Sequence, residues 1–126
     1  MESLEVKKFS KPDEVRTFNK GKLELIHIGK NTVGLAVFEP GWKWSESVKP
    51  LVNTPSCEAP HFQYHISGTL KVLMDDGTEQ ELKPGDVSLI PPGHDAWVVG
   101  NEPAVVVDFQ GMTQYAVARS SKKTHR

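Results

Sequence analysis

Turn-forming residues divide most of this chain into short apolar segments at regular intervals. The main interruptions are Glu39-Pro40-Gly41, Asp75-Asp76-Gly77, Lys83-Pro84-Gly85 and Pro91-Pro92-Gly93. The segments between them are rich in aliphatic, β-branched and aromatic residues, which favour strands. No segment after residue 21 sustains a helical apolar period. The pattern predicts an all-β domain, a β-sandwich or jelly roll.

We expect strands over residues 23–28, 33–38, 61–66, 69–74, 79–82, 87–90, 96–99 and 104–109. Residues 42–45 alternate aromatic and polar side chains and are expected to be extended, and residues 49–55 are expected to form a loop. The Asp-Gly pair at 76–77 is typical of a tight hairpin turn. Near the amino end, Ser10 precedes Pro12 and two acids, which predicts a short helical turn that stops at Gly21.

Length and composition restrict the classes of protein that remain. The chain has 126 residues, one cysteine and a formal net charge of -1. That length supports one domain with one core, and a single cysteine excludes an internal disulfide. With no overall basic field, we expect neither a nucleic acid nor a membrane as partner. The amino end lacks the apolar run of a signal peptide, which predicts a soluble, cytoplasmic protein.

The chain is expected to have three parts. Residues 1–21 form an amino-terminal arm with the short helix, residues 22–112 form the barrel, and residues 113–126 form a carboxy-terminal extension. The last eight residues of that extension contain four Lys or Arg and no acidic residue. We interpret them as a solvated basic tail.

Two segments resemble the motifs of the cupin superfamily. Residues 85–93, Gly-Asp-Val-Ser-Leu-Ile-Pro-Pro-Gly, are similar to the start of the second motif, G-x5-P-x-G-x2-H-x3-N. Residues 61–68, His-Phe-Gln-Tyr-His-Ile-Ser-Gly, are similar to the end of the first motif, H-x-H-x3,4-E-x6-G. The resemblance covers about residues 22 to 110 and implies a double-stranded β-helix, the jelly-roll barrel of small single-domain bacterial cupins.

The resemblance also implies a metal site, but most of its usual ligands are replaced here. Position by position, His61 stands at the Glu position of the first motif and Cys57 at its second His position. Pro55 falls at the first His position and Ala96 at the His position of the second motif, and neither side chain can bind a metal. A copy of the usual mononuclear centre is therefore not expected.

A substitute metal site can be assembled from other residues. Strand alternation from His61 places Gln63 and His65 on the same, barrel-facing side. Cys57 precedes His61 by four residues, and His94 follows the Pro-Pro-Gly turn on a facing segment. Cys57, His61 and His94 would suit a divalent transition metal such as zinc, iron, copper or manganese, with Gln63 or water at the open position.

Each of these residues also has a purely structural interpretation. A lone cysteine such as Cys57 is often a small buried hydrophobe. We expect His65 to be a hydrogen-bonded core residue. For His94, a role in the pocket and a structural role, in which its imidazole donates to the neighbouring Asp95 and stabilises the loop, are equally compatible with the sequence. His61 is the strongest candidate for a metal ligand or general base, because imidazole titrates near neutral pH.

Large aromatic side chains support a pocket or an interface. The chain has three tryptophans, and Trp97 directly follows a position assigned to the pocket. Apolar pockets with a few polar groups are typical of small-molecule sites. At least half of the set Trp42, Trp44, Trp97, Phe62 and Tyr64 is expected to lie in the core or in a dimer interface.

Three functions follow from these observations. The first is binding of a small molecule in a barrel pocket lined by Cys57, His61, Gln63, His94 and Trp97. The second is a metal-dependent enzyme of the oxygenase, isomerase or lyase type that uses Cys57, His61 and His94. The third is a non-catalytic interaction domain whose barrel is filled by its own side chains. In each case we expect a homodimer, because an open barrel leaves strand edges to cover.

Overall fold

The computed structural model describes residues 3–110, 112 and 115–117. Nine β-strands and two short helices occur within them. Their bounds are β1 Glu14–Phe18, β2 Gly21–Ile28, β3 Asn31–Phe38, α1 Trp44–Ser47, α2 Lys49–Val52, β4 His61–Ser67, β5 Thr69–Met74, β6 Glu79–Leu82, β7 Val87–Ile90, β8 His94–Val99 and β9 Ala104–Asp108.

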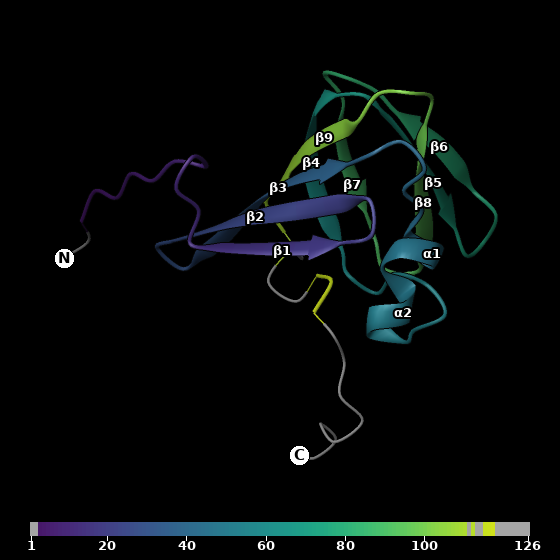
Figure 1. The fold of residues 1–126 in the computed structure, drawn as a ribbon, viewed down its shortest axis with the longest axis horizontal. Helices are drawn as coiled ribbons and strands as arrows, with labels where there is room; N and C mark the ends of the chain where they lie inside the picture. The colour runs from purple at the N-terminus through teal and green to yellow at the C-terminus, as the bar shows by residue number, and fades with distance from the viewer. Residues whose placement is uncertain (1–2, 111, 113–114, 118–126) are drawn as a thin grey trace, which may run out of the picture.

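The strands form two antiparallel sheets that face each other (Figure 1). The larger sheet has the order β1-β2-β3-β9-β4-β7, and the smaller one has the order β6-β5-β8. The neighbours of β9 are β3 and β4, which are distant from it in sequence. This arrangement confirms the predicted all-β jelly-roll fold, and each predicted strand agrees with an observed one to within a few residues.

Two glycines meet strict backbone requirements at the turns around β5. Gly77 follows Asp76 in the β5–β6 hairpin with a φ of 93°, and the Asp76 carboxylate accepts a hydrogen bond from the Thr78 N–H. Gly68 joins β4 to β5 with a φ of 74°. A Cβ at Gly68 would collide with the backbone of Pro103, so only glycine fits there.

Helical turns occur in a different place from the one predicted. Residues 14–18, expected in the amino-terminal turn, form β1 and pair with β2 from Glu14↔Leu25 to Phe18↔Gly21. The β-branched and aromatic side chains in this stretch suit a sheet edge, and pairing with β2 overrides the local capping signal.

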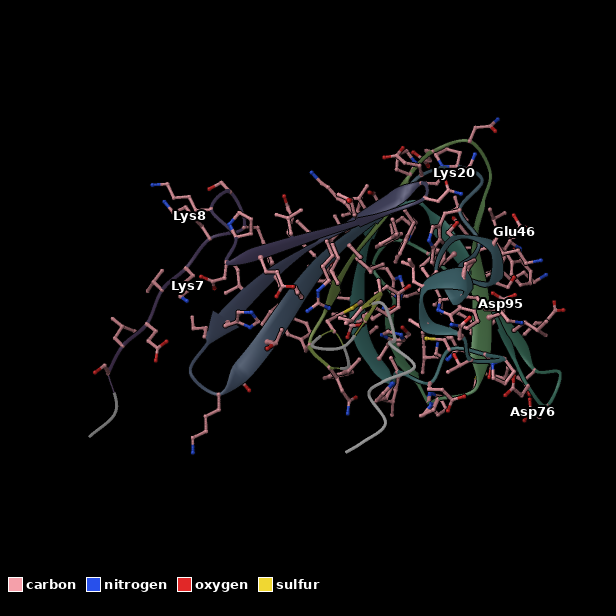
Figure 2. All side chains as sticks on the ribbon, turned by 60° about the horizontal axis from the view of Figure 1, so that its bottom comes forward. Lys7, Lys8, Lys20, Glu46, Asp76 and Asp95 are labelled. Carbon is pink, nitrogen blue, oxygen red and sulfur yellow. The ribbon has the colours of Figure 1, made fainter. Side chains whose placement is uncertain are left out.

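The two helices lie where we expected an extended segment and a loop. Trp44–Ser47 is α1, whose first turn is held by a hydrogen bond from the Ser45 N–H to the Asp95 carboxylate. Asp95 lies close beside α1 in Figure 2. Lys49–Val52 is α2, which begins with a proline in its first turn and ends at Asn53 in the left-handed conformation. Proline in the first turn and a left-handed residue at the end are ordinary helix boundaries.

The core lies between the two sheets. Leu23, Leu25, Ala36 and Val106 of the larger sheet are fully buried and belong to one apolar cluster with residues of the smaller sheet. Trp42 and Trp44 join this cluster and are both 2% exposed. Thus Trp42 and Trp44 are core residues, whereas Phe62 and Tyr64 lie outside it.

The outer surface of the larger sheet is apolar over three adjacent strands. Buried and outward side chains alternate along β4, β7 and β9, and none of the outward ones is charged. They are Phe62, Tyr64 and Ile66 on β4, Val87 and Leu89 on β7, and two half-buried valines on β9. Register places Phe62 opposite Leu89 and Tyr64 opposite Val87. We call the exposed members of this surface the outer apolar face: Phe62, Tyr64, Ile66, Val87, Leu89 and Phe109, exposed by 46% to 74%.

The remaining sequence predictions concern the two ends of the chain. Figure 2 places Lys7 and Lys8 on the amino-terminal arm, away from the hairpin that carries Asp76. The basic tail, residues 119–126, lies outside the described residues. Neither α1 nor α2 is long and apolar enough to cross a membrane, and the structure describes no other helix.

Candidate metal centre

Cys57, His61 and His94 come together at one end of the barrel. Cys57 lies in the segment before β4, His61 begins β4, and His94 begins β8. All three are buried, with exposures of 3%, 4% and 3%. One ligand atom from each lies within 4.8 Å of the others. These are the three residues that the sequence singled out as metal ligands.

Backbone hydrogen bonds connect two of the three segments directly. The Cys57 N–H donates to the His94 carbonyl at 2.7 Å, and the Gly93 N–H donates to the Cys57 carbonyl at 2.7 Å. Cys57 and His94 therefore form an isolated antiparallel bridge outside the named strand pairs. The thiol and the imidazole are thus held near each other by main-chain geometry.

Each of the two imidazoles is oriented by a hydrogen bond between its Nδ1 and an oxygen acceptor. His61 Nδ1 lies 2.5 Å from Asp108 Oδ2, and His94 Nδ1 lies 2.9 Å from the Pro91 carbonyl oxygen. A carbonyl and a carboxylate can only accept, so each Nδ1 carries the proton. A neutral ring of this kind has its lone pair on Nε2. Metal-bound histidines have the same arrangement, because their other ring nitrogen donates to a carboxylate or a backbone carbonyl.

The spacing of the donor atoms suits a tetrahedral metal ion. His61 Nε2 lies 3.8 Å from Cys57 Sγ. Bond lengths of about 2.3 Å to sulfur and 2.0 to 2.1 Å to nitrogen place the same two atoms about 3.6 Å apart in a tetrahedral zinc site. This pair therefore needs only a small contraction to bind one ion, whereas the full set of three ligand atoms, which lies within 4.8 Å, has to close further. Three protein donors leave one position of a tetrahedral ion for a further ligand.

Burial keeps the Cys57 thiol and the His94 imidazole neutral. It raises the pKa of the Cys57 thiol to about 12, chiefly because the thiolate would be desolvated. Burial also lowers the pKa of His94, against the opposing effect of its hydrogen bond to Pro91. A neutral imidazole is the form that binds metals, and a metal ion displaces the proton of a coordinating thiol.

Asp108 is the organising residue that sequence reasoning missed. Its side chain is fully buried and accepts from His61 Nδ1, from Gln63 Nε2 at 3.0 Å, and from the backbone N–H groups of Phe62 and Gln110 at 3.2 and 2.9 Å. A signal was present, because Asp108 follows Ala104 and Val106 in the inward phase of β9.

A small cavity adjoins the three candidate ligands. It has a volume of about 30 Å³, enough for about two water-sized molecules. Its lining includes Cys57, His61, Gln63 and His94. Most of the remaining lining is apolar: Phe38, Trp42, Trp44, Leu70, Val72, Ile90, Ala96, Met112 and Tyr115.

Two further lining residues come from beyond β9 and were also missed. The ring of Tyr115 meets that of His61 edge-on with centroids 5.5 Å apart, and Met112 is 1% exposed. Arg16 on β1 holds this segment, since its Nη1 donates to the carbonyls of Met112 and Tyr115 at 3.1 and 2.7 Å. Burial raises the pKa of the Tyr115 hydroxyl well above its usual range, so the phenol is neutral.

Trp97 was predicted in the pocket, and this prediction is wrong. The buried side chains of β8 are His94, Ala96 and Val98, so Trp97 falls in the opposite phase. It does not line the cavity. Instead, the Lys43 ammonium lies 5.2 Å from the centre of the Trp97 ring, in a cation–π contact.

His65 has the structural role expected from the sequence. It is 1% exposed, and its Nε2 lies 2.9 Å from the Ser88 hydroxyl. Burial lowers its pKa, although the nearby carboxylates of Asp86 and Asp108 oppose the shift. His65 is therefore neutral in the folded state.

We predict that His65 contributes to acid sensitivity. As the pH falls below about 6.5 the unfolded chain binds a proton that folded His65 does not, so the free energy of unfolding decreases by at most about 1.4 kcal/mol per pH unit. Urea unfolding of metal-free protein between pH 7.5 and 5.5 should show a smaller decrease for His65→Gln than for wild type. His27→Gln, at an exposed histidine, is the control. Equal decreases in wild type and His65→Gln would contradict the prediction.

A second hollow has no comparable chemistry. It lies between β6 and β7, has a volume of about 580 Å³, and includes Asp76, Glu81 and Asp86 in its lining. No histidine, cysteine, lysine or arginine lines it. Among the described residues, the one group of histidine, cysteine or acidic side chains close enough to share an ion is Cys57, His61 and His94 at the barrel cavity.

The fold and its neighbours define a cupin barrel. Similar solved structures include the polyketide cyclase RemF from Streptomyces resistomycificus, with a TM-score of 0.60, 14% identity, and coverage of 86% of this chain and 79% of that one. A sugar phosphate isomerase of the cupin superfamily, from Silicibacter pomeroyi, has a TM-score of 0.56 and 22% identity. The match covers 82% of this chain and 76% of the isomerase. These neighbours are cupin-family proteins, and this chain has the cupin fold.

A third neighbour is much longer than this chain. The oxalate decarboxylase of Lactobacillus farciminis, in a formate complex, has a TM-score of 0.58 and 18% identity. The match covers 81% of this chain but only 32% of the decarboxylase, so this chain spans about a third of that protein. No protein-family model matches the chain, and no curated protein matches it in sequence.

Proposed function

We propose that this protein is a small metal-binding cupin that holds a transition-metal ion on Cys57, His61 and His94. The observation that carries the proposal is the meeting of three buried donors within 4.8 Å, with Nδ1 of both imidazoles taken up by a hydrogen bond. A thiolate with two imidazoles suits zinc or copper better than manganese. The proposal joins the expected small-molecule function to the expected metal site.

The chain's own residues define what such a centre would do. Asp108 and the Pro91 carbonyl orient the two imidazoles, and the apolar lining excludes bulk water. An ion bound there supplies Lewis-acid chemistry at its open position. Because the cavity is only about 30 Å³, the molecule bound at that position has to be very small.

The test is the metal content of protein purified without chelator. We expect about one equivalent of zinc or copper by elemental analysis, and a higher melting temperature after zinc is added to metal-free protein. Cys57→Ser and His94→Ala should remove both effects, whereas His65→Gln, which changes another buried histidine, should retain them. Wild-type protein with no bound metal and no melting shift would overturn the proposal.

We also propose that the protein is a homodimer joined through the outer apolar face. Six side chains about half exposed, of up to roughly 200 Å² each, present about 600 Å² of apolar surface. This area approaches the roughly 800 Å² per partner of a standard interface, and monomeric proteins rarely expose so large a patch. A second copy fits because the face carries no charge to repel an identical face.

The position of β7 supports the same interface. It is the last strand of the larger sheet, so one of its edges has no partner among the described strands. An apolar edge strand is an association site unless it is covered. Light scattering should give the mass of a dimer at micromolar concentration, and a monomer would overturn this proposal.

A further inference from the structure

Two buried polar atoms in the cavity wall have no hydrogen-bond partner among the described residues. They are Gln63 Oε1 and Trp42 Nε1. Gln63 is 5% exposed and Trp42 is 2% exposed, and both residues line the cavity. Buried polar groups are rarely left unpaired in native proteins, so these two atoms point to a bound partner. Because both residues line the same cavity, one molecule bound there can satisfy both atoms.

The orientation of the Gln63 amide is fixed by its neighbour. Gln63 Nε2 lies 3.0 Å from Asp108 Oδ2, and a carboxylate can only accept. The amide NH₂ therefore faces Asp108, and Oε1 is the free end. Gln63 thus offers an acceptor to the cavity, so its partner must carry an N–H or O–H donor.

Trp42 supplies the opposite type of group. The indole Nε1–H can only donate, so its partner must have an acceptor atom. The indole is held in place by its ring contact with Phe38, at a centroid distance of 4.1 Å, and by its burial. The cavity therefore presents one fixed acceptor and one fixed donor beside the candidate metal ligands.

Charge and size restrict the molecule further. No lysine or arginine lines the cavity, so nothing in its wall compensates an anionic ligand. The negative charges of the Cys57 thiolate and the buried Asp108 carboxylate would together neutralise the two positive charges of a divalent ion, so no anionic ligand is needed. A volume of about 30 Å³ accommodates about two water-sized molecules, which excludes sugars, nucleotides and aromatic compounds.

We infer that the cavity selects a small uncharged molecule with both a donor and an acceptor, such as a primary amide or a hydroxyl compound of two or three heavy atoms. Its N–H or O–H donates to Gln63 Oε1, and its oxygen accepts from Trp42 Nε1. Asp108 sets the specificity indirectly, because it turns the Gln63 acceptor toward the ligand. This inference rests on the proposed metal centre, whose open position the molecule occupies.

Formamide and formate form a matched pair of probes. They have the same size and shape, but formamide is neutral and has an N–H donor, whereas formate is an anion without one. Each would be titrated into cobalt-loaded protein, with the visible absorption of the cobalt–thiolate centre as the readout. We expect formamide to bind at least tenfold more tightly than formate, because only formamide satisfies Gln63.

Two variants separate the two contacts. Gln63→Met, which keeps length but removes the acceptor, should weaken formamide binding about tenfold and leave formate binding within twofold. Trp42→Phe, which removes the donor, should weaken both probes. Ser47→Ala is the control, because Ser47 Oγ is also buried without a described partner but does not line the cavity.

The outcomes distinguish this inference from the proposed function. If the wild-type protein binds neither zinc nor cobalt, the metal centre itself is wrong and both fail. If cobalt binds but formamide binds no better than formate, only the inference about the ligand fails. An unchanged formamide affinity in Gln63→Met, with cobalt affinity retained, would also overturn it.

Discussion

Replacing Asp108 with alanine is expected to destabilise the fold by about 4 kcal/mol or more, a large part of the stability of a domain of this size. The carboxylate is fully buried and accepts from two side chains and two backbone N–H groups. Its removal leaves these donors buried without partners, at a cost of about 1 to 3 kcal/mol for each that water cannot reach. Urea unfolding followed by circular dichroism measures the change.

Asp76→Ala is the matched control for Asp108. Asp76 also accepts a backbone N–H, from Thr78, but in an exposed hairpin turn. Its replacement should change the free energy of unfolding far less than replacement of Asp108. If Asp108→Ala unfolds within 1 kcal/mol of wild type, the description of Asp108 as the organising residue is wrong.

The conservative variant Asp108→Asn separates stability from metal binding. An asparagine keeps the size of the side chain but turns either its NH₂ or its single oxygen toward His61, so the imidazole loses its negatively charged acceptor. Loss of such a partner typically lowers metal affinity about 10- to 100-fold. Competition with a chelator on folded protein measures this change.

Placing two lysines on β7 is expected to convert the dimer into a monomer. The double variant Val87→Lys, Leu89→Lys adds two positive charges per copy to the outer apolar face, at side chains exposed by 65% and 74%. In a two-fold interface these charges meet identical charges or become desolvated, so we expect dimer affinity to fall at least about 100-fold. Light scattering at micromolar concentration measures the mass.

Val15→Lys is the control for the interface. Val15 is 52% exposed and lies on β1, at the opposite edge of the same sheet. It should leave the dimer intact. A dimer that persists in the β7 double variant would show that another surface joins the copies.

The strands were predictable because glycine, proline and Asp-Gly pairs interrupt the apolar segments where the chain has to turn. The local signals at residues 10–21 and 42–55 failed for different reasons. Residues 14–18 join a sheet because β2 offers a pairing partner, which no local signal reveals. Residues 44–47 form α1, whose first turn donates to Asp95, fifty positions later in the sequence, and no local signal reveals that contact.

The candidate site was predicted in part. Cys57, His61 and His94 came from residue type and from the cupin resemblance, and strand alternation placed Gln63 correctly. The prediction for Trp97 was wrong because Ala96 occupies the inward phase of β8, so its neighbour Trp97 faces the other way. Asp108, Met112 and Tyr115 were missed because their roles depend on long-range contacts across the barrel, such as the 2.5 Å contact between Asp108 and His61.

The three donors belong to opposite walls of the barrel. His61 is part of the larger sheet, and His94 is part of the smaller one, next to Cys57 across the backbone bridge. An ion on these donors would therefore fasten one wall to the other at the end of the barrel where the cavity lies. Loss of the ion would remove this link, and the apolar core shared by the two sheets would then hold the walls together alone. Bound metal would therefore add a second, polar connection between the sheets at the end of the barrel that carries the site.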